Sequence, residues 1–113
     1  MFDTNVVFLR GTVHRDPVAR TLASGGTVTQ FDLTTRCGGV ASTVPISVAD
    51  VAVECRADDE VVVAGHVHRR FFRASGATQS RTEVVAAKVV PARRRAAVRR
   101  LAGAAAELIV ADE

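Results

Sequence analysis

The feature of this 113-residue chain that most restricts its fold is a series of segments rich in β-branched residues, in several of which apolar and polar positions alternate. A period of two places successive side chains on opposite faces of a strand, so each segment is expected to be a β-strand with one buried face. Five such segments lie at residues 5–13, 27–36, 42–49, 60–72 and 80–90. A shorter run at 18–23 predicts a minor extra strand. The chain is therefore expected to be mainly β.

Turn-forming residues separate these strands. Asp16-Pro17 ends the first one, because proline donates no hydrogen bond to a ladder and restricts the residue before it. Gly25-Gly26 supplies a turn that accepts positive φ angles. The loop 73–79 joins the last two strands, which predicts a long hairpin.

Two further segments complete the expected fold. Residues 49–60 fit a helix and a strand equally, because their apolar residues occur at both spacings. After Pro91 the chain is rich in Ala and Arg, with apolar residues near one face, which predicts a helix or a tail that becomes helical against a partner. Five strands with one short helix between the third and fourth is the order of an OB-fold, a small Greek-key barrel. We expect an OB-fold domain at 1–91 and a helical or flexible tail at 92–113.

Charge is unevenly distributed along the chain, whose net charge is +3. Residues 1–65 hold five arginines and eight acids, whereas residues 66–100 hold nine arginines, one lysine and the single acid Glu83. A basic segment of this density is typical of a surface that binds a polyanion. The alternative is a solvated surface that reflects a biased amino-acid usage, because fourteen of the fifteen bases are arginine.

The order and spacing of these features resemble the bacterial single-stranded DNA-binding protein (SSB) family over about residues 5–90. That family opens with an Asn-led hydrophobic strand ending in glycine, followed by Asp-Pro, an arginine, a glycine-containing turn and a second strand. The matching residues are Asn5, Gly11, Asp16, Pro17, Arg20, Gly25, Gly26, Phe31 and Leu33. The similarity resumes in the valine-rich runs at 60–72 and 80–87, which match the family's fourth and fifth strands.

The resemblance implies a protein that binds single-stranded DNA with little sequence preference and protects it during replication, repair or recombination. Members of the family stack bases on aromatic rings, and each stacked base contributes about 1–3 kcal/mol. Strand alternation places His66, His68, Arg70 and Phe72 on one face, which matches the family's groove-facing line. Arg70 suits a phosphate or a base, and His68 suits a hydrogen bond. The residues expected to bind DNA are Phe72, Arg70, His68, Arg73, Phe71, Arg36, Arg10 and Arg81.

The chain also departs from the family pattern in its aromatic residues. It has neither Trp nor Tyr, and Thr43 and Ala49 stand where family members often carry aromatics. This depletion favours a second hypothesis, an OB-fold adaptor of the primosomal type that binds proteins and binds DNA weakly or not at all. The resemblance further implies a homo-oligomer, either a tetramer or a dimer, assembled through the first strand and the outer barrel face.

Other functional classes find little support in the sequence. His66 and His68 lack the spacing of a metal site, and no nucleophile or phosphate-binding loop stands in a known motif. We therefore expect no enzyme activity, metal, cofactor or small-molecule substrate. The sequence has no apolar run long enough to cross a membrane and no visible signal peptide. With two dissimilar cysteines, Cys37 and Cys55, it is predicted to be a cytoplasmic, nucleoid-associated protein.

Overall fold

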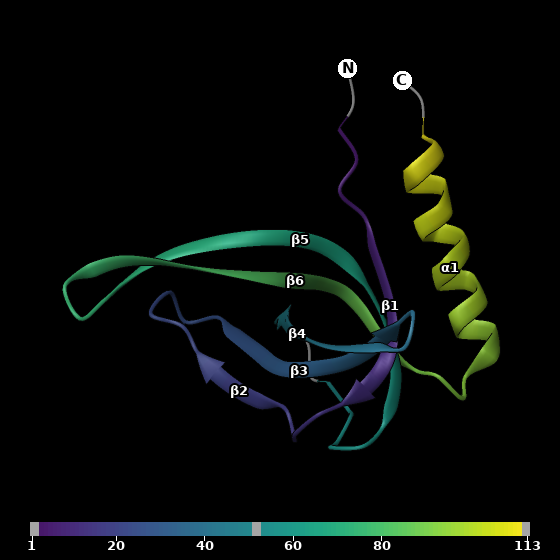
Figure 1. Cartoon of the computed structure of the whole chain (residues 1–113), viewed down its shortest axis with the longest axis horizontal. Helices are drawn as coiled ribbons and strands as arrows, with labels where there is room; N and C mark the ends of the chain where they lie inside the picture. The colour runs from purple at the N-terminus through teal and green to yellow at the C-terminus, as the bar shows by residue number, and fades with distance from the viewer. Residues whose placement is uncertain (1–2, 51–52, 112–113) are drawn as a thin grey trace.

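The computed structural model describes residues 3–50 and 53–111 (Figure 1). The strands are β1 (Val7–Val13), β2 (Val18–Thr21), β3 (Thr27–Cys37), β4 (Val40–Ala49), β5 (Glu60–Ala74) and β6 (Ala77–Pro91). A helix, α1 (Arg95–Val110), follows β6 and lies beside β1 in Figure 1. No helix in this part of the chain is long and apolar enough to span a membrane.

The strands close into a barrel. The sheet order is β1-β5-β6-β4-β3-β2, and a further pairing of β1 with β3 closes β1, β5, β6, β4 and β3 on themselves. Neighbours run antiparallel except β4 and β6, which are parallel. The all-β, five-stranded barrel predicted from the sequence is therefore confirmed. β2 is the minor extra strand and pairs with β3.

Alternation within the strands creates the core. Leu33 and Ile46 from β3 and β4, with Val13, Val61 and Val63 from β1 and β5, are fully buried in the barrel. Burial of each such side chain stabilises the fold by about 1.5–3 kcal/mol. The residues between them point outward, which is the period-two pattern that the sequence predicts.

The prediction of a short helix between the third and fourth main strands, which are β4 and β5 here, is wrong. Residues 53–59 form a loop, and residues 51–52 lie outside the described part of the chain. Val53 packs against the core and Cys55 is buried, so alternate residues of this segment face the barrel. Asp58 has a φ of 73°, which no helix residue adopts. The helix of this chain lies instead at the C-terminus.

Aspartates hold this loop in place. The carboxylate of Asp16 accepts a hydrogen bond of 2.8 Å from the backbone N–H of Ala57. The carboxylate of Asp59 accepts one of 3.0 Å from the N–H of Arg56. The Asp-Pro corner after β1 therefore turns the chain and also fastens the loop that leads into β5.

β5 and β6 form a longer hairpin than the sequence indicates. Both strands continue to a two-residue turn, Ser75-Gly76, whose φ angles are 51° and 76°. Two positive φ angles are characteristic of the type I′ turn that connects twisted antiparallel strands. Beyond Val67 and Val84, β5 and β6 pair only with each other within the described residues. We call this two-stranded extension, residues 68–83, the arm; in Figure 1 it reaches to the left of the barrel.

α1 packs on the outer side of β1, β5 and β6. Ala105 is the buried residue of the helix. Val62 of β5 and Ala92 after β6 are also buried, although neither belongs to the core cluster inside the barrel. The end of the helix is different, because Leu108, Ile109 and Val110 are all more than half exposed. The predicted C-terminal helix is thus present and covers part of the barrel wall.

Candidate nucleic-acid interface

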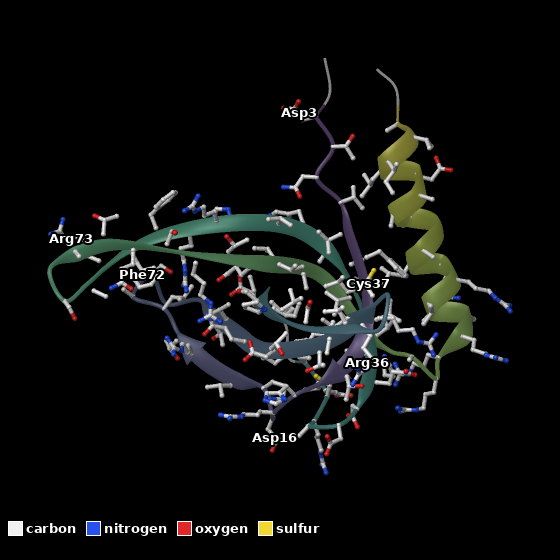
Figure 2. All side chains as sticks on the ribbon, in the orientation of Figure 1. Asp3, Asp16, Arg36, Cys37, Phe72 and Arg73 are labelled. Atoms are coloured by element: carbon white, nitrogen blue, oxygen red, sulfur yellow. The ribbon has the colours of Figure 1, made fainter. Side chains whose placement is uncertain are left out.

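Four of the eight predicted residues gather on one face of the arm. Register pairs His68 with Glu83, Arg70 with Arg81, and Phe72 with Gln79, and directly opposed residues lie on the same face. We call these six residues the first face. It brings one aromatic ring, two arginines and a histidine together. Figure 2 shows Phe72 in the outer part of the arm.

Arg70 and Phe72 contact each other on the first face. The guanidinium carbon of Arg70 lies 5.7 Å from the centroid of the Phe72 ring. A cation at this distance is attracted to the ring by about 0.5–1 kcal/mol at an exposed site. Phe72 remains 38% exposed. The ring thus offers accessible aromatic surface with a guanidinium positioned against it.

Glu83 is a member of the first face that the sequence analysis missed. Its side chain is only 7% exposed, and its Oε1 lies 3.7 Å from Nη2 of Arg70. Arg70 and Arg81 oppose each other across the arm, and like charges in that relation destabilise a strand pair. Glu83 offsets this repulsion with a carboxylate. The Ser75-Gly76 dipeptide was the available signal, because a two-residue turn there fixes the register that places Glu83 opposite His68.

The predicted residues Phe71 and Arg73 lie on the opposite side of the arm. Strand alternation places them with Arg69, and register pairs these three with Thr82, Ser80 and Thr78 of β6. We call these six residues the second face. Arg73 donates a hydrogen bond of 3.0 Å to the carbonyl oxygen of Gly76 at the turn. Arg69 was not among the predicted residues.

The last two predicted residues, Arg10 and Arg36, are remote from the arm. Arg10 forms an ion pair of 3.0 Å with Glu60. Arg36 lies near Arg10, because its neighbour in the chain, Thr35, donates a hydrogen bond of 3.0 Å to the carbonyl oxygen of Arg10. Figure 2 shows Arg36 at the other end of the molecule from Phe72 and Arg73. The structure does not unite all eight residues in one site.

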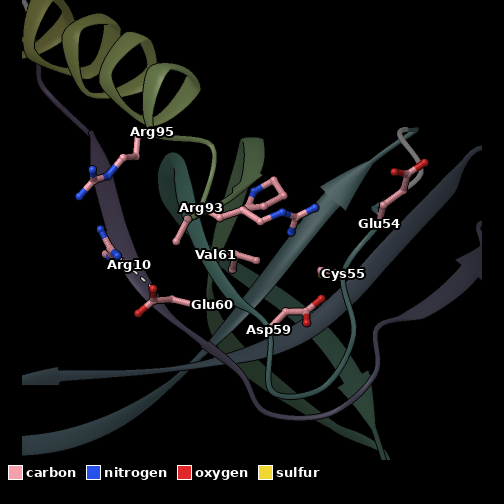
Figure 3. A pocket seen from close by; sticks show the side chains of 10 residues that line it. Arg10, Glu54, Cys55, Asp59, Glu60, Val61, Arg93 and Arg95 are labelled. Atoms are coloured by element: carbon pink, nitrogen blue, oxygen red, sulfur yellow. Dashed lines mark hydrogen bonds and ion pairs between the residues drawn. The ribbon is translucent and has the colours of Figure 1, made fainter.

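A cavity of about 340 Å³ lies between Arg10 and the start of α1 (Figure 3). Its charged lining is balanced, because the arginines are matched by as many acids: Arg10, Arg93 and Arg95 with Glu54, Asp59 and Glu60. Such a lining gives little net attraction for an anion.

Cys55 also lines this cavity. Burial, with a smaller contribution from Asp59, raises the pKa of its thiol to about 11, so the thiol stays protonated near neutral pH. No three side chains suited to a metal are grouped anywhere in residues 3–50 and 53–111.

Comparison with known proteins supports the fold. Neither known family models nor curated proteins give a match to this chain. Among solved structures, the chain is similar to the Plasmodium falciparum SSB in its complex with ssDNA. The two align with a TM-score of 0.68 and 20% identity, over 80% of this chain and 97% of that one. This likeness shows that the two chains share a fold.

Proposed function

We propose that this chain binds single-stranded DNA through the first face of the arm. The observation that carries the proposal is the exposed ring of Phe72 with the guanidinium of Arg70 against it and Arg81 across the strand pair. Stacking surfaces flanked by basic groups are the usual means of binding single strands. The likeness to an SSB solved with ssDNA gives further support.

Four residues of the first face have a chemical role in this proposal. A base stacks on Phe72, Arg70 and Arg81 contact phosphates, and His68 donates a hydrogen bond. Every base has a π-face and phosphates carry no sequence information, so little sequence preference is expected. A protein of this kind protects exposed strands during replication, repair or recombination. Its place of action is the nucleoid.

The test is a fluorescence-anisotropy titration at low salt, with labelled oligo-dT and a duplex of the same length. We expect the single strand to bind more tightly, because a duplex keeps its base faces stacked and out of reach of Phe72. Equal affinity for the duplex would contradict the stacking role. No binding of oligo-dT would instead favour the protein-binding adaptor that the aromatic depletion suggests.

We further propose that useful affinity requires assembly of several copies. One arm offers few rings, whereas linked sites on several subunits multiply affinity through their effective concentration. Phe8 on β1 is 39% exposed and is a candidate contact between copies. Sedimentation at micromolar concentration is expected to show an oligomer. A monomer that still binds oligo-dT tightly would contradict this expectation.

A further inference from the structure

The second face of the arm repeats the chemistry of the first. The guanidinium carbon of Arg69 lies 5.4 Å from the centroid of the Phe71 ring, close to the 5.7 Å between Arg70 and Phe72. The repetition follows from the order Arg-Arg-Phe-Phe at 69–72. Because a strand alternates, doubling each residue type gives each face one arginine followed two positions later by one phenylalanine.

Phe71 is more accessible than Phe72. Its exposed fraction is 65%, against 38% for Phe72. Arg69 donates a hydrogen bond of 3.0 Å from Nη2 to the hydroxyl of Ser80, which is the cross-strand partner of Phe71. This bond holds the guanidinium beside the ring. The ring therefore presents open surface next to a fixed cation.

The rest of the second face suits a polyanion. Its members other than Arg69 and Phe71 are Arg73, Thr78, Ser80 and Thr82, so cations and hydroxyl groups surround the ring. The single acid of the arm, Glu83, lies on the first face. A protein partner held by apolar contact would need a continuous apolar patch, but Phe71 is the only large apolar residue among these six.

Both faces of the arm are open to a ligand, because every residue of the two faces except Glu83 is exposed. β1 reaches only to Gly65 on β5, and β4 reaches only to Val84 and Val85 on β6. Within the described residues the arm is therefore a two-stranded ribbon without a neighbouring strand on either edge. A flexible single strand can pass from one face to the other around such a ribbon.

We propose that the second face is a further binding site for single-stranded nucleic acid, with a base stacked on Phe71 and phosphates held by Arg69 and Arg73. This inference rests on the proposed function, in that the same strand continues onto it from the first face. The arm then binds through both sides.

Photo-crosslinking tests the second face directly. Oligo-dT that carries a photoreactive thymine analogue is irradiated with the full chain, and the crosslinked peptides are mapped by mass spectrometry. Crosslinks at both Phe71 and Phe72 are expected. Crosslinks at Phe72 alone would overturn the second site and leave the proposed function intact. If oligo-dT fails to bind, both proposals are overturned.

Substitutions give a second and quantitative measurement. Phe71→Leu removes the aromatic face but keeps apolar bulk, and it is expected to weaken oligo-dT binding by about 5- to 140-fold. Phe71→Tyr is expected to restore binding, and Phe72→Leu reports on the first face. Val40→Ala is the control, because this exposed apolar residue lies at the start of β4, outside both the arm and β1.

Two results would overturn the second site. One is wild-type affinity in the Phe71→Leu variant while Phe72→Leu loses affinity. The other is a change in sedimentation of Phe71→Leu with unchanged DNA affinity, which would assign this face to contact between protein copies. An unchanged far-ultraviolet circular dichroism spectrum and melting temperature show that each variant is folded.

Discussion

Replacement of Glu83 by glutamine is expected to tighten the binding of single-stranded DNA. Glu83 places a nearly buried negative charge beside Arg70, one of the arginines proposed to hold phosphate. In the free chain this carboxylate attracts Arg70. In the complex it repels the phosphate that Arg70 contacts. Glutamine keeps the size of the side chain and removes the charge, so the repulsion disappears.

The magnitude follows from the geometry. An ion-pair contact adds about 3 Å to the 3.7 Å between Arg70 and Glu83, so the phosphate lies about 7 Å from the carboxylate. Two unit charges at that separation repel by about 1.2–2.4 kcal/mol at an effective dielectric constant of about 20–40. Screening at about 0.1 M salt roughly halves this value. The remaining 0.6–1.2 kcal/mol or so corresponds to about 3- to 7-fold higher affinity.

The assay is anisotropy with labelled oligo-dT at fixed salt, and Glu60→Gln is the matched control. Glu60 also pairs with an arginine, Arg10, but it lies away from the arm. Its substitution by glutamine makes the same change in net charge without altering the first face. We expect little effect there. Affinity of Glu83→Gln at or below that of wild type would refute the reasoning. An equal gain in both variants would show that only net charge matters.

Three further outcomes are expected. In a salt series, Phe72→Ala should lose about 1–3 kcal/mol of binding free energy with an unchanged slope, whereas Arg70→Ala should flatten the slope of log K against log salt by about 0.7; salt-insensitive binding would contradict both. Gly65→Ala should lower the melting temperature, because a Cβ there would overlap the β6 backbone, and an unchanged melting temperature would contradict this packing. Exposed Cys37 should react with a thiol reagent at pH 8, whereas buried Cys55, whose pKa is raised to about 11, should react only after unfolding; equal rates would contradict the burial.

The pH dependence of stability follows from the same raised pKa. A thiol whose folded pKa lies above its unfolded value of 9.0 contributes stability below that value and loses it as pH rises through about 11. Thermal unfolding of wild type and of Cys55→Ala at pH 8 and at about pH 10.5 measures this contribution. The difference between the two proteins should shrink at the higher pH.

The sequence predicts the barrel well because its strands obey period-two alternation. In β3 the alternate residues Thr29, Phe31 and Leu33 are the ones that the structure buries. Residues 53–59 could not be assigned in this way. Their conformation depends on Asp16, which bonds to Ala57 from 41 positions away. A local pattern carries no information about such a contact.

The candidate site was predictable only in part for a related reason. Alternation along one strand places Arg70 and Phe72 on the same face, and the structure has them there. The position of Glu83 requires the register between two strands, which depends on the length of the turn at Ser75-Gly76. The sequence around Arg10 does not indicate its ion pair with Glu60, because β1 and β5 come together only when the barrel forms.

The arm differs from the barrel in what its residues contribute to folding. A two-stranded ribbon is marginally stable by itself, and its side chains between His68 and Glu83 have no core to fill. Packing therefore restricts these positions less than it restricts the barrel interior. Phe71 gains little for the folded state, because 65% of its surface stays in contact with water, and Phe72 keeps 38% of its surface exposed. The exposed part of each ring contributes further free energy only when something else covers it, and stacked bases of a single strand would cover both rings.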